Sequence, residues 1–357
     1  MTTSTPAETP TRMAASVLTS RRTIELKDVP IPPLEPDQVL VRIEAVGVCG
    51  SDTHFYLEGH IGDLVVDGPI ILGHESAGRI VAVGDAVDPV RLGRRVSIEP
   101  QRPCRACRHC KSGEYNLCVA MEFYGAYPVE GAFSEFAVIQ DDFAFEVPDN
   151  LSADEAALIE PVSVAVHACR RAQVTAASRV FITGAGPIGL LTAQVALAFG
   201  AGEVVVSDPV ESRRRFAETL GAISTIDPRE TDLDDLELHF DSYIDASGNA
   251  RAILQAIPTL RRGGRIVLVG MGNDTIELPI AVIQNRELEL TGTYRYANTW
   301  PTAIDLVARG EVAVAPLVTG HVGLADVEAA LLMAQSDPSS IKTIVVPDRA
   351  VAHESTP

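Results

Sequence analysis

The first 150 residues contain several short stretches in which apolar and polar side chains alternate. QVLVRIEAVGV (38–48), GRRVSIEP (93–100) and GAFSEFAVIQ (131–140) show this period of two, and IILGHESAGRIVAVGDAV (70–87) is mostly apolar with glycine breaks. A period of two predicts β-strands, and the glycines and prolines between them predict turns. Many short strands indicate a small barrel or sandwich from about residue 14 to residue 147.

The period becomes helical at SADEAALIEPVSVAVHACRRA (152–172). Ser152 is a candidate N-cap, and the apolar residues after it recur at helical intervals. Pro161 must interrupt or begin a helix, because proline lacks the backbone N–H that an interior turn requires. We therefore expect a domain junction in this stretch.

Strands and helices alternate from Arg179 to about Thr293. The strand-like stretches RVFITGAG, EVVVSD, DSYIDAS and RIVLVG are separated by the helix-like stretches PIGLLTAQVALAFG, ESRRRFAETLG and ARAILQAIPTLRRGG. This alternation predicts an α/β domain with a parallel sheet and helices on both faces. The later stretches TWPTAIDLVARG, ADVEAALLMAQ and IKTIVVP are expected to pack back on the first domain.

These changes of pattern divide the chain into five parts. We expect a disordered tail over 1–13, a β-rich domain over 14–161 with a lobe at 100–120, an α/β domain over 162–296, a C-terminal part over 297–349 and a tail over 350–357. A chain of 357 residues is long enough for two domains that each bury a core.

Composition and charge narrow the choice of partners. A composition of 46% hydrophobic and 22% charged residues is typical of a globular protein. No apolar run reaches the ~18 residues of a membrane span. A net charge of −19 argues against nucleic acid or a membrane surface, which attract clustered Lys and Arg. The first residues, MTTSTPAETPTRM, lack the apolar core of a signal peptide. We expect a cytoplasmic protein with a small-molecule partner.

The stretch GAGPIG predicts a nucleotide site between a strand and a helix. Gly184 would permit the tight turn, Gly186 the approach of a pyrophosphate, and Gly189 the packing of helix on strand. Asp208 follows the next strand, where its carboxylate could take both ribose hydroxyls and repel a 2′-phosphate, so NAD is expected rather than NADP. Further residues assigned to the cofactor are Pro187, Ile188, Arg213, Val269, Gly270, Met271, Thr293, Tyr294 and Arg295.

Two other interpretations of this site stay open. Arg213, Arg214 and Arg215 stand in one run, and one of them could bind the phosphate of NADP. A glycine-rich turn can also occur without any ligand, although the strand, the helix and the acidic residue together favour a nucleotide.

Four of the six cysteines form one cluster with metal-ligand spacing. Cys104, Cys107, Cys110 and Cys118 give C-x2-C-x2-C-x7-C, and their four thiolates can close a tetrahedron around zinc. Such a site has no vacant position and four negative charges, so we expect it to hold a loop in shape rather than to react. Two disulfides or a loop of reactive thiols are the alternatives.

A second, dispersed set of residues could hold a catalytic zinc. Cys49, His74, Glu75 and Glu160 offer a mixed set of thiolate, imidazole and carboxylate, which leaves a position for water or substrate. One thiolate and one carboxylate would leave the metal neutral and able to polarise an alcohol, so one direct glutamate is expected. The residues alone do not say which glutamate is the ligand. Cys169 is interpreted as a buried free cysteine.

The motifs GVCGSD, GHESAG, the four-cysteine lobe, EPVSVAVHACRR, GAGPIG and TYRYANTWP resemble those of the zinc-dependent medium-chain dehydrogenases, and within them the sorbitol (polyol) dehydrogenases. The resemblance runs from about Ala15 to Pro347. It implies a GroES-like β-rich catalytic domain, a Rossmann doubly wound coenzyme domain, two zinc ions per subunit, one catalytic and one structural, and a homotetramer.

The resemblance also implies roles for single residues. Cys49, His74 and Glu75 match the family's catalytic zinc ligands, and Glu160 matches the residue that binds the water or substrate on the metal. Arg295 and Tyr296 match residues that hydrogen-bond the further hydroxyls of a polyol.

One residue departs from the family pattern. The family often has Tyr after the His of CGSDxH, where this chain has Phe55. The missing hydroxyl is expected to alter which polyol is preferred.

The implied reaction is oxidation of a secondary alcohol of a polyol to a ketose, with hydride transfer to NAD and proton release through Ser51 and His54. Ser51 could instead only cap a turn, and His54 could be a plain surface histidine. Alternative functions are the same chemistry on threonine, butanediol or a cyclitol, a zinc-free reductase on the same fold, and a non-catalytic NAD-binding protein. The intact Cys49, His74 and Glu75 argue against the zinc-free reductase.

Overall fold

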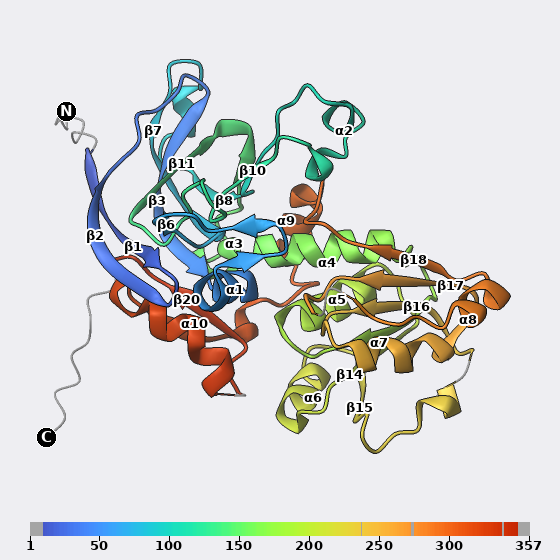
Figure 1. Ribbon diagram of the computed structural model, residues 1–357. Helices are drawn as coiled ribbons and strands as arrows, with labels where there is room; N and C mark the ends of the chain where they lie inside the picture. The colour runs from blue at the N-terminus through green and yellow to red at the C-terminus, as the bar shows by residue number, and fades with distance from the viewer. Residues whose placement is uncertain (1–9, 237, 273–274, 338, 349–357) are drawn as a thin grey trace, which may run out of the picture.

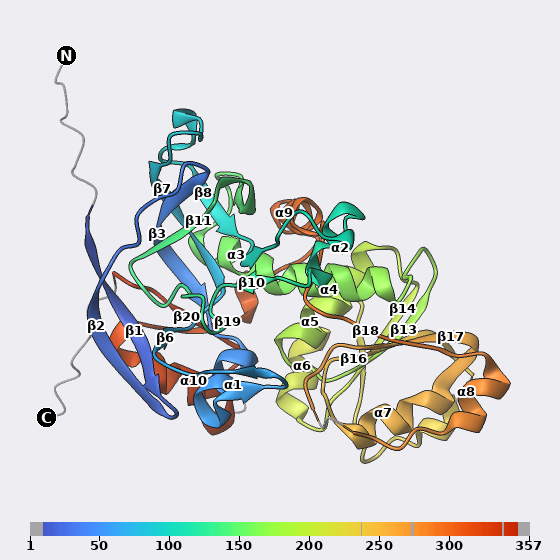
Figure 2. The same ribbon diagram turned by 45° about the horizontal axis from the view of Figure 1, so that its top comes forward.

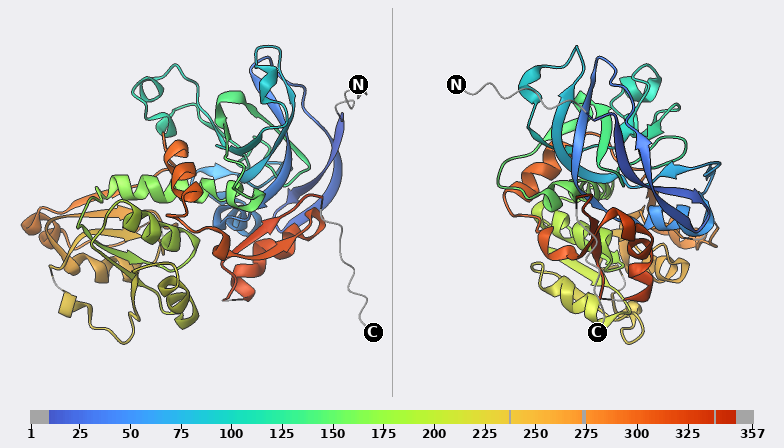
Figure 3. Two further views of the ribbon diagram at one scale, coloured as in Figure 1. Left: turned by 180° about the vertical axis from the view of Figure 1, so that it is seen from behind. Right: turned by 90° about the vertical axis from the view of Figure 1, so that its left-hand side faces the viewer.

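A computed structural model describes residues 10–236, 238–272, 275–337 and 339–348 (Figure 1). Most of both predicted tails lies outside these residues. Within the predicted N-terminal tail, strand β1 already begins at Arg12, and Met13 is buried. The chain forms two sheet-based domains that lie side by side, joined along a long central helix, as Figure 3 shows from two further directions.

The first domain is built on a mixed seven-stranded sheet of order β12-β8-β7-β3-β20-β19, with β11 paired to β3. Its strands are β3 (Gln38–Gly47), β7 (Glu75–Val83), β8 (Arg95–Ile98), β11 (Phe136–Gln140), β12 (Ala144–Glu146), β19 (Val318–Val322) and β20 (Lys342–Val345). The last two strands come from the C-terminal part of the chain. They are therefore members of the sheet rather than a layer packed on it.

Smaller elements surround this sheet. A three-stranded sheet contains β1 (Arg12–Ser20), β2 (Thr23–Pro30) and β6 (Ile70–Ile71), and two hairpins pair β4 (His60–Ile61) with β5 (Leu64–Val65) and β9 (Gln101–Arg102) with β10 (Glu122–Phe123). Three helices, α1 (Gly50–Glu58), α2 (Arg108–Lys111) and α10 (Val327–Ser336), complete the domain. Helix α10 packs on α1 and β20.

The second domain has a parallel six-stranded sheet of order β15-β14-β13-β16-β17-β18. Its strands are β13 (Arg179–Thr183), β14 (Glu203–Ser207), β15 (Ser224–Ile226), β16 (Phe240–Asp245), β17 (Leu260–Leu268) and β18 (Glu289–Gly292), and its helices are α5 (Pro187–Ala198), α6 (Glu211–Glu218), α7 (Ala250–Ala256) and α8 (Ile280–Arg286). The strand order reverses between β13 and β16, so right-handed connections place α5 and α6 on one face and α7 and α8 on the other. This order confirms the predicted doubly wound fold.

Two helices at the junction join the domains. Helix α3 (Ala153–Ala157) begins at the predicted cap, where Ser152 Oγ accepts the backbone N–H of Glu155 and the Glu155 carboxylate accepts the N–H of Ser152. Helix α4 (Ile159–Arg171) follows at once, with Pro161 as its third residue, where its missing N–H costs nothing. The expected domain boundary between residues 161 and 162 therefore lies inside α4.

Helix α4 packs against α5 of the second domain and against α9 (Trp300–Ala308), and Figure 2 shows it running between the two sheets. Its buried face is continuous with a core that includes Val180 and Ile182 of β13 and Trp300 of α9. Among the described residues, no helix is both long and apolar enough to cross a membrane.

Candidate active site

Cys49, His74 and Glu75 come together at one end of the seven-stranded sheet of the first domain. Their potential ligand atoms all lie within 4.8 Å of one another, although the residues come from the N-terminus of α1 and the start of β7. His74 and Glu75 are buried, and Cys49 is partly exposed. A thiolate, an imidazole and a carboxylate at this spacing fit a zinc ion with one position left for water or substrate.

Gly47 makes room for the carboxylate of this cluster. It is the antiparallel partner of Glu75 across β3 and β7, and a Cβ placed on it would lie 2.1 Å from Glu75 Oε2. Any other residue at position 47 would displace the Glu75 carboxylate. The glycine is therefore required by this arrangement of ligands.

Asp52 orients the histidine of the cluster. Its side chain is fully buried, and Oδ1 lies 3.4 Å from His74 Nδ1, which leaves His74 Nε2 for a metal. The Asp52 carboxylate also accepts the backbone N–H groups of Cys49 at 3.0 Å and Gly73 at 3.1 Å. One carboxylate thus fixes two of the three candidate ligands.

Lys342 neutralises the carboxylate of the cluster. Its buried ammonium donates to Glu75 Oε1 and Oε2 at 2.7 and 2.8 Å, and to the carbonyl oxygen of Val48 at 2.9 Å. Strand β20 supplies this lysine through its pairing with β3. The Lys342–Glu75 ion pair explains how a cluster that contains the Cys49 thiolate and the Glu75 carboxylate can be buried at low net charge.

Glu160, from the first turn of α4, faces the same cavity but lies outside the three-residue cluster. Tyr296 donates a hydrogen bond of 2.6 Å to Glu160 Oε1, and both side chains are buried. Burial raises the pKa of Glu160 to about 7. The Tyr296 hydroxyl points at Glu160. A substrate hydroxyl that contacts Tyr296, as the sequence predicts, must therefore lie next to the Glu160 carboxylate.

Two cavities meet at the cluster. The nucleotide-side cavity, of about 310 Å³, is lined by Gly186, Pro187, Ile188, Val269, Gly270 and Met271 of the second domain and by Cys49, His54 and Glu75 of the first. The substrate-side cavity, of about 270 Å³, is lined by Ser51, Phe55, His74, Phe123, Glu160, Thr293, Tyr294, Arg295 and Tyr296. Cys49, Glu75, Ile188, Val269 and Met271 border both. Most predicted site residues therefore line one connected space between the domains.

The predicted proton-relay residues lie on different sides of this space. Ser51 Oγ is 3.4 Å from His74 Nε2 and borders the substrate side. His54 borders the nucleotide side, is 42% exposed and lies 3.3 Å from the Glu58 carboxylate. Helix α1 carries both residues three positions apart, so their side chains share one face of the helix.

The glycine-rich loop lies between β13 and α5. Gly184 has φ +97°, which only glycine adopts readily, and a Cβ on Gly189 would lie 1.8 Å from the carbonyl oxygen of Gly184. Gly186 caps α5 and has open space where a Cβ would stand. The free N–H groups at this helix start can meet a phosphate.

Asp208 follows β14 beside this loop. Its carboxylate accepts the backbone N–H groups of Ala185 and Val210, each at 2.8 Å. Of the neighbouring arginines, Arg214 lies 3.1 Å from Asp227, and Arg215 pairs with Glu211. Arg213, the third arginine, has a buried Nε without a hydrogen-bond partner.

The four lobe cysteines form a separate cluster around α2. Cys110 Sγ lies 3.5 Å from Cys107 Sγ and 3.9 Å from Cys104 Sγ, and Cys118 Sγ completes the group. A tetrahedron with Zn–S bonds of ~2.3 Å has S–S edges of about 3.8 Å, so the donor set fits zinc. All six cysteines of the chain are free thiols, and Cys169 is buried as expected.

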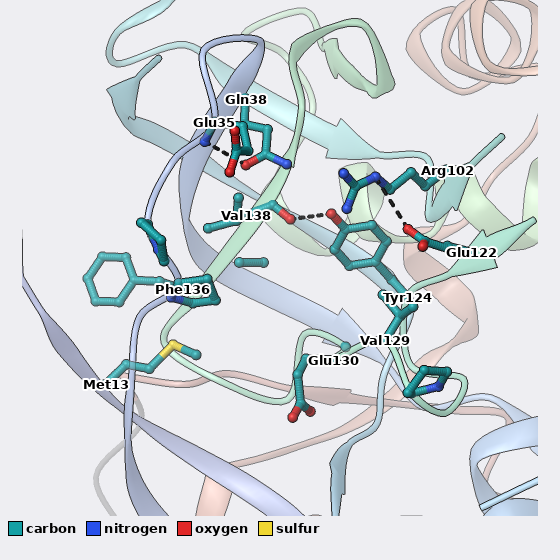
Figure 4. A pocket seen from close by; sticks show the side chains of 15 residues that line it. Met13, Glu35, Gln38, Arg102, Glu122, Tyr124, Val129, Glu130, Phe136 and Val138 are labelled. Atoms are coloured by element: carbon teal, nitrogen blue, oxygen red, sulfur yellow. Dashed lines mark hydrogen bonds and ion pairs between the residues drawn. The ribbon is translucent and has the colours of Figure 1, made fainter. Parts of the chain in front are cut away.

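A further hollow, of about 530 Å³, lies on the catalytic domain (Figure 4). Its rim includes the Arg102–Glu122 ion pair of 3.4 Å, and Tyr124 donates across it to the carbonyl oxygen of Val138. None of the predicted site residues lines it. The hollow is therefore not a second entrance to the active site.

Three residues of the site were not identified from the sequence. Gly47 and Asp52 are the first and last residues of the motif GVCGSD, but the sequence alone suggests no role for either. Lys342 lies in the stretch IKTIVVP, which was interpreted only as a strand. A lysine within such an apolar stretch is itself a signal, because a buried cation requires a partner.

Comparison with known proteins agrees with this architecture. Residues 35–149 match the family model of the alcohol dehydrogenase GroES-like domain, and residues 187–309 match that of the zinc-binding dehydrogenase. The chain is 40% identical to sorbitol dehydrogenase of Bacillus subtilis (strain 168) over 348 residues, covering 95% of this chain and 99% of that protein. It is 39% identical to D-xylulose reductase A of Aspergillus oryzae, covering 92% and 95% of the two chains.

Solved structures resemble the whole chain. L-idonate 5-dehydrogenase of Escherichia coli superposes with a TM-score of 0.89 at 29% identity, over 94% of this chain and 98% of that one. 2R,3R-butanediol dehydrogenase of Bacillus subtilis superposes with a TM-score of 0.86 at 29% identity, over 94% and 100%. With both family models, the sorbitol dehydrogenase relative and the two-domain fold in agreement, the chain belongs to the zinc-dependent medium-chain dehydrogenases, in their sorbitol (polyol) dehydrogenase family.

Proposed function

We propose that this protein oxidises a secondary alcohol of a polyol of the sorbitol or xylitol type to the ketose, passing hydride to NAD and releasing a proton. The observation that carries the proposal is the position of the Cys49–His74–Glu75 cluster where the two cavities meet: Cys49 and Glu75 line both cavities, and His74 lines the substrate side. A carbinol carbon held there faces a nicotinamide on one side and has room for the rest of a polyol on the other. The names of the sorbitol dehydrogenase and D-xylulose reductase relatives point to the same substrate class.

The residues around the cluster have separate proposed roles in this reaction. A zinc ion in the Cys49–His74–Glu75 cluster, when bound, polarises the alcohol O–H as a Lewis acid. Asp52 holds the imidazole, and Lys342 keeps the buried carboxylate compensated. Glu160, held by the Tyr296 hydroxyl at 2.6 Å, accepts a hydrogen bond from a substrate hydroxyl.

Ser51 and His54 are proposed as the route for the proton. The Ser51 hydroxyl borders the substrate side, and the half-exposed imidazole of His54 can pass a proton to solvent. Arg295 is proposed to hold the further hydroxyls. Its guanidinium stacks 3.9 Å from the Phe123 ring centroid, and its buried Nη1 has no protein partner.

NAD is proposed over NADP because of the Asp208 carboxylate beside the glycine-rich loop. Two solved relatives were crystallised with different cofactors, one with NADP at 30% identity and one with NADH at 28%. Comparing kcat/KM for the two cofactors tests the proposal, and a preference for NADP would reverse it. An Asp208→Ser variant should narrow the difference, because it removes the charge that repels a 2′-phosphate.

Two zinc ions per subunit, a homotetramer and a cytoplasmic location remain proposals. The first rests on the two clusters of thiol, imidazole and carboxylate groups, and the others on the family resemblance and the sequence. Metal analysis of the purified protein and sedimentation of the assembly test the first two. One zinc per subunit would contradict the two-site interpretation.

An NADH-formation assay with sorbitol, xylitol, ribitol, galactitol, threonine and butanediol tests the substrate class. The highest kcat/KM is expected for a polyol, with activity lost on metal removal and regained with zinc. The apolar walls formed by Phe55, Ile61 and Leu64 favour a short diol as the second candidate. Preference for butanediol or threonine, or full turnover after metal removal, would reject the proposal.

A further inference from the structure

The cysteine lobe and the substrate-facing segment Tyr294–Asn298 lie against each other, and Figures 1 and 2 show the lobe that carries α2 next to α9. We infer that Tyr115 and Asn116 of the lobe are positioning residues, which set the places of Arg295 and Tyr296 for substrate. The inference rests on the proposed polyol function and gives the lobe a role in substrate binding.

Three direct hydrogen bonds join the two segments. Asn116 Nδ2 donates to the carbonyl oxygen of Tyr294 at 2.9 Å, at one end of the segment. At the other end the backbone N–H of Asn298 donates to the Tyr115 hydroxyl at 2.8 Å, and Asn298 Nδ2 donates to the carbonyl oxygen of Gly113 at 2.8 Å. Asn116 is buried, so its bond is shielded from water.

A buried network ties down the middle of the segment. Gln101 Nε2 donates to the carbonyl oxygen of Tyr296 and to Glu99 Oε1, both at 2.9 Å. The Tyr115 hydroxyl donates to the same Glu99 oxygen at 2.8 Å. Gln101 is fully buried and Glu99 is 1% exposed. One tyrosine of the lobe therefore reaches the segment both directly and through two buried side chains.

The segment requires such support because its backbone is strained. Arg295 and Asn298 have φ values of +55° and +54°, a region that non-glycine residues rarely adopt. Strand β18 ends at Gly292 and α9 begins at Trp300, so helix or sheet hydrogen bonds do not fix these residues. If the lobe contacts are removed, the segment can relax, and Arg295 and Tyr296 move with it.

The cysteine cluster in turn fixes the lobe side of this contact. Cys110 and Cys118 flank residues 113–116 in the chain and belong to the four-cysteine group. Their position determines where Tyr115 and Asn116 stand. The lobe thus serves substrate recognition although its sulfur atoms lie outside the substrate cavity.

Asn116→Asp and Tyr115→Phe test the inference, with Leu117→Ala as the matched control. Asn116→Asp keeps the shape but turns an acceptor toward the Tyr294 carbonyl oxygen, Tyr115→Phe removes only the hydroxyl, and Leu117 is an exposed neighbour. We expect each test variant to raise KM for the best polyol about tenfold, the value of one well-placed hydrogen bond. Turnover of 2-propanol, which has no further hydroxyls, should change less than about twofold. Zinc content should not change.

A second measurement needs no substrate. Trp300 is the single tryptophan of the chain, and the centroid of its ring lies 5.2 Å from that of the Tyr296 ring. Acrylamide quenching of its fluorescence should increase in both test variants and stay at the wild-type value in Leu117→Ala. Wild-type polyol kinetics and quenching in both test variants, or equal losses on the polyol and 2-propanol, would overturn the inference. If the wild type oxidises no polyol, the proposed function fails, while the quenching result still decides whether the lobe holds the segment.

Discussion

Replacing Gly47 with alanine should remove metal from the catalytic cluster while leaving the fold in place. The new Cβ would lie 2.1 Å from Glu75 Oε2, whereas ordinary contacts begin at about 3.4 Å. The carboxylate must therefore move by more than about 1 Å, but ligand distances in metal sites hold within ±0.2 Å. The main-chain strain should be small, because the end of a side chain can move.

The expected loss of zinc affinity at this cluster is at least 10- to 100-fold, equivalent to about 1.4–2.7 kcal/mol. Competition with a chromogenic chelator, together with zinc analysis after dialysis, measures it. One zinc per subunit should remain in the lobe as an internal reference, and turnover should fall in proportion to the metal lost. Circular dichroism and thermal unfolding report whether the fold is kept.

Gly50→Ala is the matched control. Gly50 begins α1 directly after Cys49, and a Cβ there meets nothing within 4 Å. This variant should keep both zinc ions, because its new methyl group touches no ligand and alanine is favoured in a helix. Unchanged chelator resistance in Gly47→Ala would refute the argument that Glu75 is a ligand in the position described.

Three further predictions concern other side chains. Asp52→Asn should lower zinc affinity or turnover about 10- to 100-fold, because the carboxylate that holds His74 is lost; wild-type values in chelator competition and activity assays would contradict this. Phe55→Tyr adds a hydroxyl to the substrate cavity and should change the kcat/KM ratio between sorbitol and xylitol by up to about tenfold, so an unchanged ratio would count against a role for this position. Burial, with smaller contributions from Arg171 and Arg170, lowers the pKa of His167 from 6.5 to about 4. The unfolded chain therefore protonates His167 at a higher pH than the folded chain does, so the free energy of unfolding should decrease as pH falls from about 6.5 to about 4. In urea titrations the His167→Gln variant should lack this decrease. An equal slope in that variant would show that other groups cause it.

Local signals were sufficient for much of the fold. The helical period with Ser152 as cap predicted α3 and α4, and the strand–helix alternation after Arg179 predicted the parallel sheet. These predictions are confirmed because hydrophobic period and capping act between residues close in sequence. Membership of β19 and β20 in the first sheet was not predicted, since pairing between distant strands leaves no local pattern.

The sequence by itself determined the types of chemistry available: a glycine-rich turn, four clustered thiols, and the dispersed Cys49, His74, Glu75 and Glu160. The tertiary structure alone decided how they combine. It placed Glu75 rather than Glu160 with Cys49 and His74, since the close β3–β7 pairing at Gly47 directs the Glu75 carboxylate inward. It also brought Lys342 to Glu75, 267 positions away in the sequence. Such contacts depend on which strands pair and in which register, and these are decided by the packing of the entire domain.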